Sequence, residues 1–175
     1  MIEEKYKELY NLSIKVYEEQ HNRYVGHQDK ATKYLSVLTI IIGLYGYYSK
    51  WLIDKIILQH SNIDCIDWIV AFMSFVLFIC LIVAWFLILE VMKVRKLAVL
   101  PLTDETIKFY YDNKLIDIYY TMSKGIKNAI EINNPILDKM SNHLAMAYFW
   151  VKVGSIIFLL LFGLYVLHSL RILNF

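Results

Sequence analysis

The chain has 175 residues, of which 58% are hydrophobic and 19% are charged, and its formal net charge is +2. So small a charge argues against nucleic-acid binding by the chain as a whole, because basic contacts to phosphates dominate such binding. The hydrophobic share exceeds that of an average soluble domain. The first question is therefore where this apolar excess lies.

Three long apolar runs hold the excess. Residues 69–89 carry no charge over 21 positions, about 31 Å of helix at about 1.5 Å per residue, which matches a hydrocarbon core of about 30 Å. Residues 153–170 are a second uncharged run, and residues 34–53 are a third with Lys50 near its end. Three such helices are hard to bury in so short a chain. We therefore predict an all-α integral membrane protein with three transmembrane helices extended into a cytosolic helical bundle.

The runs divide the chain into five predicted parts. These are a cytosolic N-terminal helix (1–33), span 1 (34–53), span 2 (66–92), a cytosolic helical region (93–147) and span 3 (148–171). Lys and Arg number six in residues 1–33 and eight in residues 93–139, whereas the outer side of the first two spans has only Lys50, at the end of span 1, and Lys55. By the positive-inside rule we expect a cytosolic N-terminus and a C-terminus on the periplasmic or extracellular side of a bacterial inner membrane.

The N-terminal part is expected to run into span 1 as one helix, because no Gly-Pro pair interrupts it. Residues at spacings of three and four predict its packed face: Tyr6, Leu9, Ser13, Val16, Gln20, Arg23 and His27. This face becomes more polar toward the predicted membrane.

Two helical pieces are predicted in the second cytosolic region. Thr103 can cap a short helix that ends near Asn113. A second, amphipathic stretch carries an apolar stripe of Leu115, Tyr119, Met122, Ile126 and Ile130. Two readings remain open after it: Asn134 caps a new helix with Pro135 in its first turn, or Pro135 lies within one longer helix.

Polar residues gather where span 1 begins, in "RYVGHQDKATKYL" (residues 23–35). Arg23, His27, Lys30 and Lys33 are interpreted as a collar that meets phosphates of lipid headgroups or rings a pore entrance. No His-x-x-x-His or Cys-x-x-Cys spacing supports a metal site. We predict no catalytic residues, no metal and no cofactor.

Within the spans, small and polar residues of span 1 are candidates for pore lining or helix packing, because small residues let another helix approach closely. They are Ser36, Thr39, Gly43, Gly46 and Tyr47. Glu90 and Lys152 are expected at the same inner level, where they can form an ion pair between helices.

The layout resembles the small membrane effectors of bacterial anti-phage systems, such as the transmembrane effectors of cyclic-pyrimidine signalling (Pycsar). The segments that carry the resemblance are "QDKATKYLSVL" (28–38) and "NNPILDKMSNHLAMAYFWVKVG" (133–154). Size and helical make-up are also similar to the membrane accessory proteins encoded beside RNA-targeting CRISPR effectors. One such accessory protein is linked to a degenerate Arg/His nuclease (HEPN) motif, which Arg23 and His27 echo with a gap of three residues instead of four to six.

The resemblance implies a non-enzymatic membrane effector that oligomerises and perturbs or permeabilises the inner membrane. Its expected partners are other copies of itself and the lipid bilayer, together with a soluble CRISPR or nucleotide-signalling protein, and no direct nucleic-acid contact is expected. One alternative is a non-conducting anchor or scaffold that recruits a soluble defence protein. A HEPN-like ribonuclease is the most distant alternative.

Overall fold

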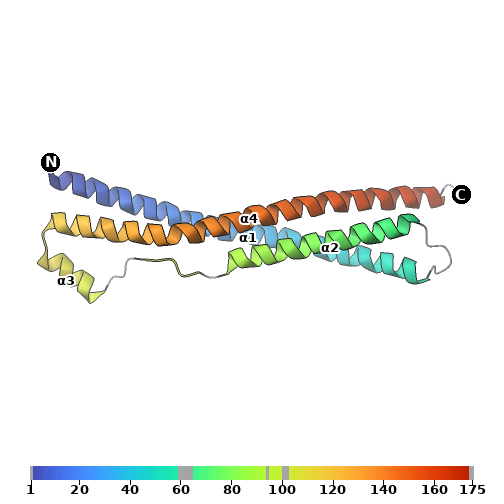
Figure 1. Ribbon diagram of the computed structural model, residues 1–175, viewed down its shortest axis with the longest axis horizontal. Coiled ribbons are helices and arrows are strands. Elements are labelled where there is room, and N and C mark those ends of the chain that lie inside the picture. Colours follow the sequence, from blue (N-terminus) through green and yellow to red (C-terminus); the bar gives the residue numbers. More distant parts are fainter. Residues whose placement is uncertain (1, 59–64, 94, 100–102, 174–175) are drawn as a thin grey trace. The chain divides into compact units, whose positions relative to one another are not determined.

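The computed structural model describes residues 2–58, 65–93, 95–99 and 103–173. Four helices and no strand form within these ranges (Figure 1). The helices are α1 (Ile2–Leu58), α2 (Cys65–Met92), α3 (Asp104–Asp112) and α4 (Leu115–Leu173). The predicted all-α class is confirmed for the described residues. The middle of the predicted connection between spans 1 and 2, residues 59–64, lies outside them.

The chain divides into two units that are described separately. The polar unit comprises Met1–Asp29 and Lys93–Asn142, and the apolar unit comprises Lys30–Met92 and His143–Phe175. Helices α1 and α4 each contribute a segment to both units. The predicted continuity of the N-terminal helix with span 1 is confirmed, because α1 is unbroken from Ile2 to Leu58.

The two readings of Pro135 are resolved in favour of a single helix. α4 runs through Pro135, so the expectation that Asn134 caps a new helix is wrong. A proline inside a helix removes one backbone hydrogen bond and costs about 3 kcal/mol. Buried residues on both sides of it, including Asn133 and Leu137, supply packing that offsets this cost and holds the helix together.

The short helix α3 begins and ends as its sequence predicts. Thr103 has an extended backbone, and its Oγ1 accepts a hydrogen bond from the amide of Thr106 at 3.3 Å. Asn113 is the C-terminal cap. Partial burial and a hydrogen bond with Tyr10 raise the pKa of Tyr110 above its usual value. The Tyr10 contact therefore attaches α3 to α1.

In the polar unit, α1 and α4 lie side by side and run in the same direction. Tyr6 packs edge-on against Tyr120 with ring centroids 6.0 Å apart, and further along both helices Gln20 donates a hydrogen bond to Asn134. The partner numbers rise together, which fixes the parallel direction.

The packed face of α1 differs from the predicted one. Its buried and half-buried residues include a series at alternating spacings of four and three: Tyr6, Tyr10, Ser13, Tyr17, Gln20, Tyr24 and His27. Leu9, Val16 and Arg23 were expected on this face but are exposed. Tyrosine rings take their place, because the facing surface of α4 presents aromatic partners such as Tyr119, whose centroid lies 5.5 Å from that of Tyr10. On α4, Met122 and Ile126 are buried as predicted, whereas Leu115 is exposed.

The apolar unit packs segments of α1, α2 and α4 around leucines, among them the fully buried Leu38, Leu77 and Leu161. Tyr45 of α1 donates a hydrogen bond to the carbonyl of Ser74 on α2 at 3.1 Å. Gly154 of α4 is buried against α2, where an added Cβ would lie 3.5 Å from the side chain of Leu77 and 3.6 Å from that of Cys80.

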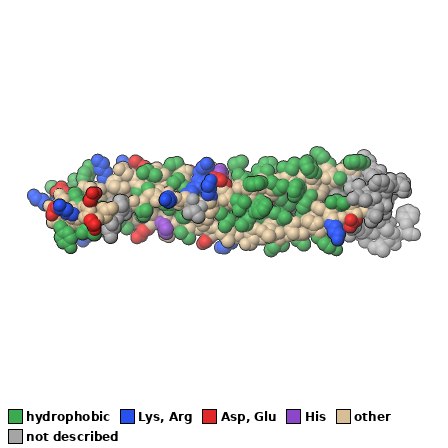
Figure 2. Space-filling model, turned by 90° about the horizontal axis from the view of Figure 1, so that it is seen from below, with side chains coloured by type: hydrophobic (Ala, Val, Ile, Leu, Met, Phe, Trp, Pro, Cys, Tyr) green, Lys and Arg blue, Asp and Glu red, His purple; other side chains and the backbone are tan. Residues whose placement is uncertain are grey.

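Among the described residues, two helices are long and apolar enough to cross a membrane: Trp68–Met92 of α2 and a stretch within Leu115–Leu164 of α4. α2 exposes large side chains such as Trp68, Phe72 and Phe86. Hydrophobic side chains cover much of the face of the apolar unit seen in Figure 2. Exposed apolar surface of this extent marks a membrane or protein contact. The described part of α1 does not meet the same criterion, since tyrosines, small residues and Lys50 dilute its apolar run.

Replacing Gly154 with leucine is expected to lower the melting temperature of the protein in mild detergent, because the added side chain overpacks the contact with Leu77 and costs about 1–3 kcal/mol. Gly163→Leu is the matched control: Gly163 is exposed, and its added Cβ would meet no atom within 4 Å. Equal melting temperatures for the two variants would contradict the packing described for Gly154.

Candidate functional site

The four collar residues fall in both units. Arg23 and His27 belong to the polar unit, and Lys30 and Lys33 belong to the apolar unit. Arg23 Nη2 lies 3.7 Å from Asp138 Oδ1 of α4, and both side chains are more than half exposed. An exposed ion pair of this kind contributes about 0–1 kcal/mol. The sequence had not identified Asp138 as a partner of Arg23, and the role of the collar stays a prediction.

All five candidate pore-lining or packing residues of α1 lie on exposed positions of the apolar unit: Ser36, Thr39, Gly43, Gly46 and Tyr47. The Ser36 and Thr39 hydroxyls donate to the carbonyls of Thr32 and Leu35, at 3.0 and 2.8 Å. Their protons are therefore satisfied within the helix. A Cβ added at Gly43 or Gly46 would meet no atom within 4 Å.

Four of these positions, all except Tyr47, belong to a longer periodic surface, which we call the polar stripe. It consists of six exposed residues at alternating spacings of four and three: Thr32, Ser36, Thr39, Gly43, Gly46 and Lys50. The buried Ala31 and Leu38 lie on the opposite side of the helix. Neither α2 nor α4 of the same unit covers the polar stripe.

The predicted ion pair between Glu90 and Lys152 involves two helices of the apolar unit. Glu90 of α2 is half-buried, and Lys152 of α4 is exposed. The pair stays a prediction.

A buried amide that sequence reasoning missed anchors the segment between α2 and α3. Asn133 of α4 is 1% exposed. Its Oδ1 accepts a hydrogen bond from the amide of Ala98 at 2.8 Å, and its Nδ2 donates to the carbonyl of Ala98 at 3.1 Å. The Tyr17 hydroxyl of α1 donates to the same carbonyl at 3.2 Å. Asn133 thus pairs with the backbone of Ala98 as a neighbouring strand would.

A second buried amide, Gln20, joins α1 to α4 close to Pro135. Gln20 Nε2 donates to the Ile130 carbonyl at 3.1 Å and to Asn134 Oδ1 at 2.6 Å. Because Pro135 has no N–H, the Glu131 carbonyl loses its usual helical donor, and Gln20 adds contacts to Ile130 and Asn134 in the same turn. The sequence contained a signal for these contacts: Tyr17, Gln20 and Tyr24 recur at heptad spacing, and two asparagines precede the proline.

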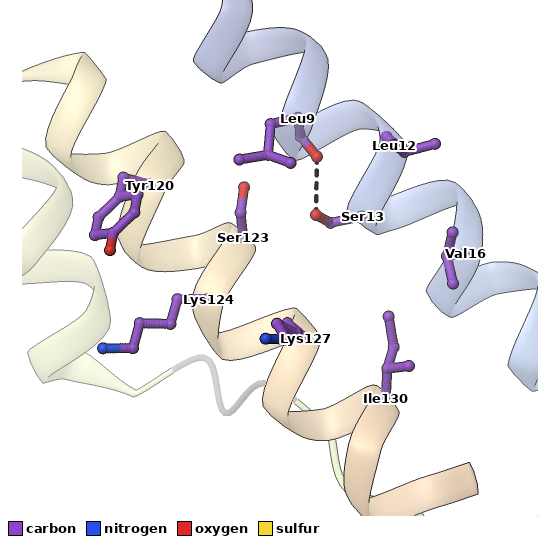
Figure 3. A pocket seen from close by; sticks show the side chains of 9 residues that line it. All are labelled: Leu9, Leu12, Ser13, Val16, Tyr120, Ser123, Lys124, Lys127 and Ile130. Atoms are coloured by element: carbon purple, nitrogen blue, oxygen red, sulfur yellow. Dashed lines mark hydrogen bonds between the residues drawn. The ribbon is translucent and has the colours of Figure 1, made fainter.

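A groove of about 440 Å³ lies between α1 and α4 within the polar unit (Figure 3). From α1 it is lined by Leu9, Leu12, Ser13 and Val16, and from α4 by Tyr120, Ser123, Lys124, Lys127 and Ile130. Its walls are mainly apolar, with two lysines on the α4 side. The Ser13 hydroxyl donates to the Leu9 carbonyl at 2.8 Å. The groove therefore offers apolar surface and positive charge but no arrangement of a nucleophile and a base.

Within the part of the chain that the structure describes, no three His, Cys, Asp or Glu residues come close enough together to hold a metal ion. Protein-family models, curated proteins and solved structures were compared with the chain, and none of them matches it.

Asn133→Ala is expected to release residues 95–99 from α4, since it removes both hydrogen bonds to Ala98. The Ala98 carbonyl keeps its bond from Tyr17, but the Ala98 amide loses its partner, at about 1–3 kcal/mol. Limited trypsin digestion should then cut faster after Arg95 or Lys96. Asn128→Ala, at an exposed position of the same helix, is the control. Unchanged cleavage in Asn133→Ala would show that this pairing does not hold the segment.

Proposed function

We propose that the chain is a bacterial inner-membrane effector of anti-phage defence that acts as an oligomer and permeabilises the membrane. In this proposal α1 crosses the bilayer as a third span alongside α2 and α4, the N-terminus is cytosolic, and the C-terminus is periplasmic or extracellular. The segment Tyr34–Ile53 is 20 residues long, about 30 Å of helix. Lys50 reaches the headgroups from its end by extending its aliphatic stem.

The polar stripe is the observation that carries this proposal. Large apolar side chains favour contact of a helix face with lipid. The exposed surface of α2 carries such side chains, among them Phe72, Phe75 and Phe86. The polar stripe instead presents hydroxyls, glycines and a lysine at all six of its positions from Thr32 to Lys50. Small residues permit close contact with another helix, and hydroxyl oxygens retain acceptor capacity for water. The polar stripe therefore suits contact with other copies of α1 or with a water-filled path.

Three spans from one chain are too few to enclose a water path, so conduction requires several copies. The role in defence is supported by the resemblance carried by residues 28–38 and 133–154. On this proposal the chain performs no chemistry, and binding energy between copies drives its action.

The proposal is tested by measuring membrane potential in bacterial cells that express the chain at high density, where mass action favours assembly. We expect depolarisation by the native chain. The double variant Ser36→Leu with Gly43→Leu should reduce it at least about tenfold, because bulky side chains block the close approach of helices, at about 1.4 kcal/mol per factor of ten.

The matched control is Val37→Leu with Ile40→Leu, which changes exposed residues on the neighbouring face of α1. It should depolarise cells as the native chain does. Full membrane potential in cells expressing correctly inserted native chain would contradict the proposal and favour a non-conducting anchor. Depolarisation that disappears in Arg23→Ala with His27→Ala, but not in the polar-stripe variant, would also contradict the proposed role of the stripe.

A further inference from the structure

The residues that follow α2 are basic and have no acid among them. Residues 91–103 include Lys93, Arg95 and Lys96 but no Asp or Glu. We call residue 93 together with residues 95–99 the basic segment. Lys93 and Lys96 are exposed, and Arg95 is half-buried. Within the part of the chain that the structure describes, neither Lys93 nor Lys96 forms an ion pair.

The helices packed against the basic segment do not neutralise its charge. Ala98 of the segment is hydrogen-bonded to Asn133 of α4 and to Tyr17 of α1. Within two helical turns of these two contacts, each helix carries two basic and two acidic residues. They are Lys127, Glu131, Asp138 and Lys139 on α4, and Lys15, Glu18, Glu19 and Arg23 on α1. The nearest acid before the segment is Glu90 in the last turn of α2, and three basic residues against this one acid leave a net charge of +2.

The basic segment begins where a candidate membrane span ends. Lys93 directly follows Met92, the last residue of the α2 stretch that is long and apolar enough to cross a membrane. Lys96 is four positions beyond Met92, so the two Cα atoms are at most about 14 Å apart. The headgroup layer covers about 5–8 Å outside the hydrocarbon core, and a lysine can extend its amine toward that layer along its aliphatic stem. All three basic side chains are therefore within reach of lipid phosphates when α2 spans a bilayer.

We propose that the basic segment binds anionic phospholipid at the membrane surface where α2 ends. This inference rests on the part of the proposed function that places α2 across the bilayer. Basic side chains near an anionic membrane surface attract its headgroups over about 10 Å at physiological salt. Because Asn133 holds Ala98 through both of its backbone groups, the segment meets the lipid already ordered, which lowers the entropic cost of binding.

Soluble anions fit the basic segment less well. Affinity for nucleic acid grows with the number of phosphates contacted, and the two flanking helices add no net positive charge to the three basic residues. These residues follow one another along non-helical backbone, an arrangement that presents charges to a surface and does not surround a single ion.

Limited trypsin digestion of the full-length protein in lipid vesicles tests the contact. The vesicles contain either phosphatidylcholine alone or phosphatidylcholine and phosphatidylglycerol in equal parts. The rate of cleavage after Arg95 is divided by the rate after Lys114, an exposed residue between α3 and α4, which corrects for trypsin access to each kind of vesicle. We expect phosphatidylglycerol to lower this ratio at least about tenfold, because bound headgroups cover Arg95. Added salt should reverse the protection, since it screens the attraction.

Two double variants separate this contact from a general effect of charge. Lys93→Gln with Lys96→Gln removes two charges of the basic segment, so the protection of Arg95 by phosphatidylglycerol should fall below about threefold. Lys108→Gln with Lys124→Gln removes the same charge from exposed positions of α3 and α4 and should keep the full protection. Helical circular dichroism should be the same for both variants and the native chain, because all four lysines are exposed.

Equal cleavage ratios in the two kinds of vesicle, or equal protection in the two variants, would overturn the proposed lipid contact. Protection by RNA or inorganic phosphate on phosphatidylcholine vesicles, without protection by phosphatidylglycerol, would assign the segment to a soluble anion and also overturn it. Either result in a chain that depolarises cells leaves the proposed function standing. Protection by phosphatidylglycerol in a chain that does not depolarise cells would support the lipid contact and count against the proposed function. A chain that alkaline washing removes from the vesicles would contradict the insertion of α2, on which both proposals rest.

Discussion

The parallel pairing of α1 with α4 is the interaction on which the rest of the structure depends. In the polar unit, Gln20 binds Ile130 and Asn134, which lie 110 and 114 positions along the chain. In the apolar unit, Tyr34 stacks on Tyr148 of the same two helices, with ring centroids 6.1 Å apart. A helix of 57 or 59 residues is far longer than the about 20 residues that cross a bilayer. Each of these helices therefore continues well beyond one bilayer thickness, and α1 and α4 contact each other in both the apolar and the polar unit.

The side chains that join α1 and α4 differ between the polar unit and the apolar unit. In the polar unit, tyrosine rings and the amides of Gln20 and Asn133 provide specific contacts, and Asn133 also holds Ala98 beside α4. In the apolar unit, leucines and the small residue Gly154 allow close packing against α2, because apolar burial contributes little between helices in lipid and shape decides. The faces left uncovered follow the same division: a groove flanked by charges in one unit, and the polar stripe in the other.

Helix boundaries could be predicted from the sequence wherever local chemistry decides them. Thr103 and Asn113 mark the ends of α3, and the unbroken pattern through residue 33 predicts the continuity of α1. The predicted packed face of α1 differs from the observed one, because Leu9 and Val16 are more apolar than Tyr10 and Tyr17. Hydropathy alone therefore favours burying the leucine and the valine. Only the facing aromatic surface of α4 reverses that preference.

The sequence around the proline resembles the start of a helix locally, with Asn133 and Asn134 before Pro135. Long-range contacts to Ala98 and Gln20 keep the helix continuous instead. The candidate residues of span 1 could be recognised because small polar residues stand out in an apolar run. The groove could not be predicted, because it is formed by two segments more than a hundred residues apart in the sequence.

The central claim is that α1 crosses the membrane with the polar stripe facing a water-filled path and the neighbouring face meeting lipid. Single cysteines at positions 36, 37, 39, 40, 43 and 44, in a chain with Cys65→Ser and Cys80→Ala, can be treated in intact cells with a small, water-soluble, membrane-impermeant thiol reagent. The account predicts reaction with a helical period: cysteines at 36, 39 and 43 react, and those at 37, 40 and 44 do not. Equal reactivity at all six positions, or reaction only at 37, 40 and 44, would contradict it.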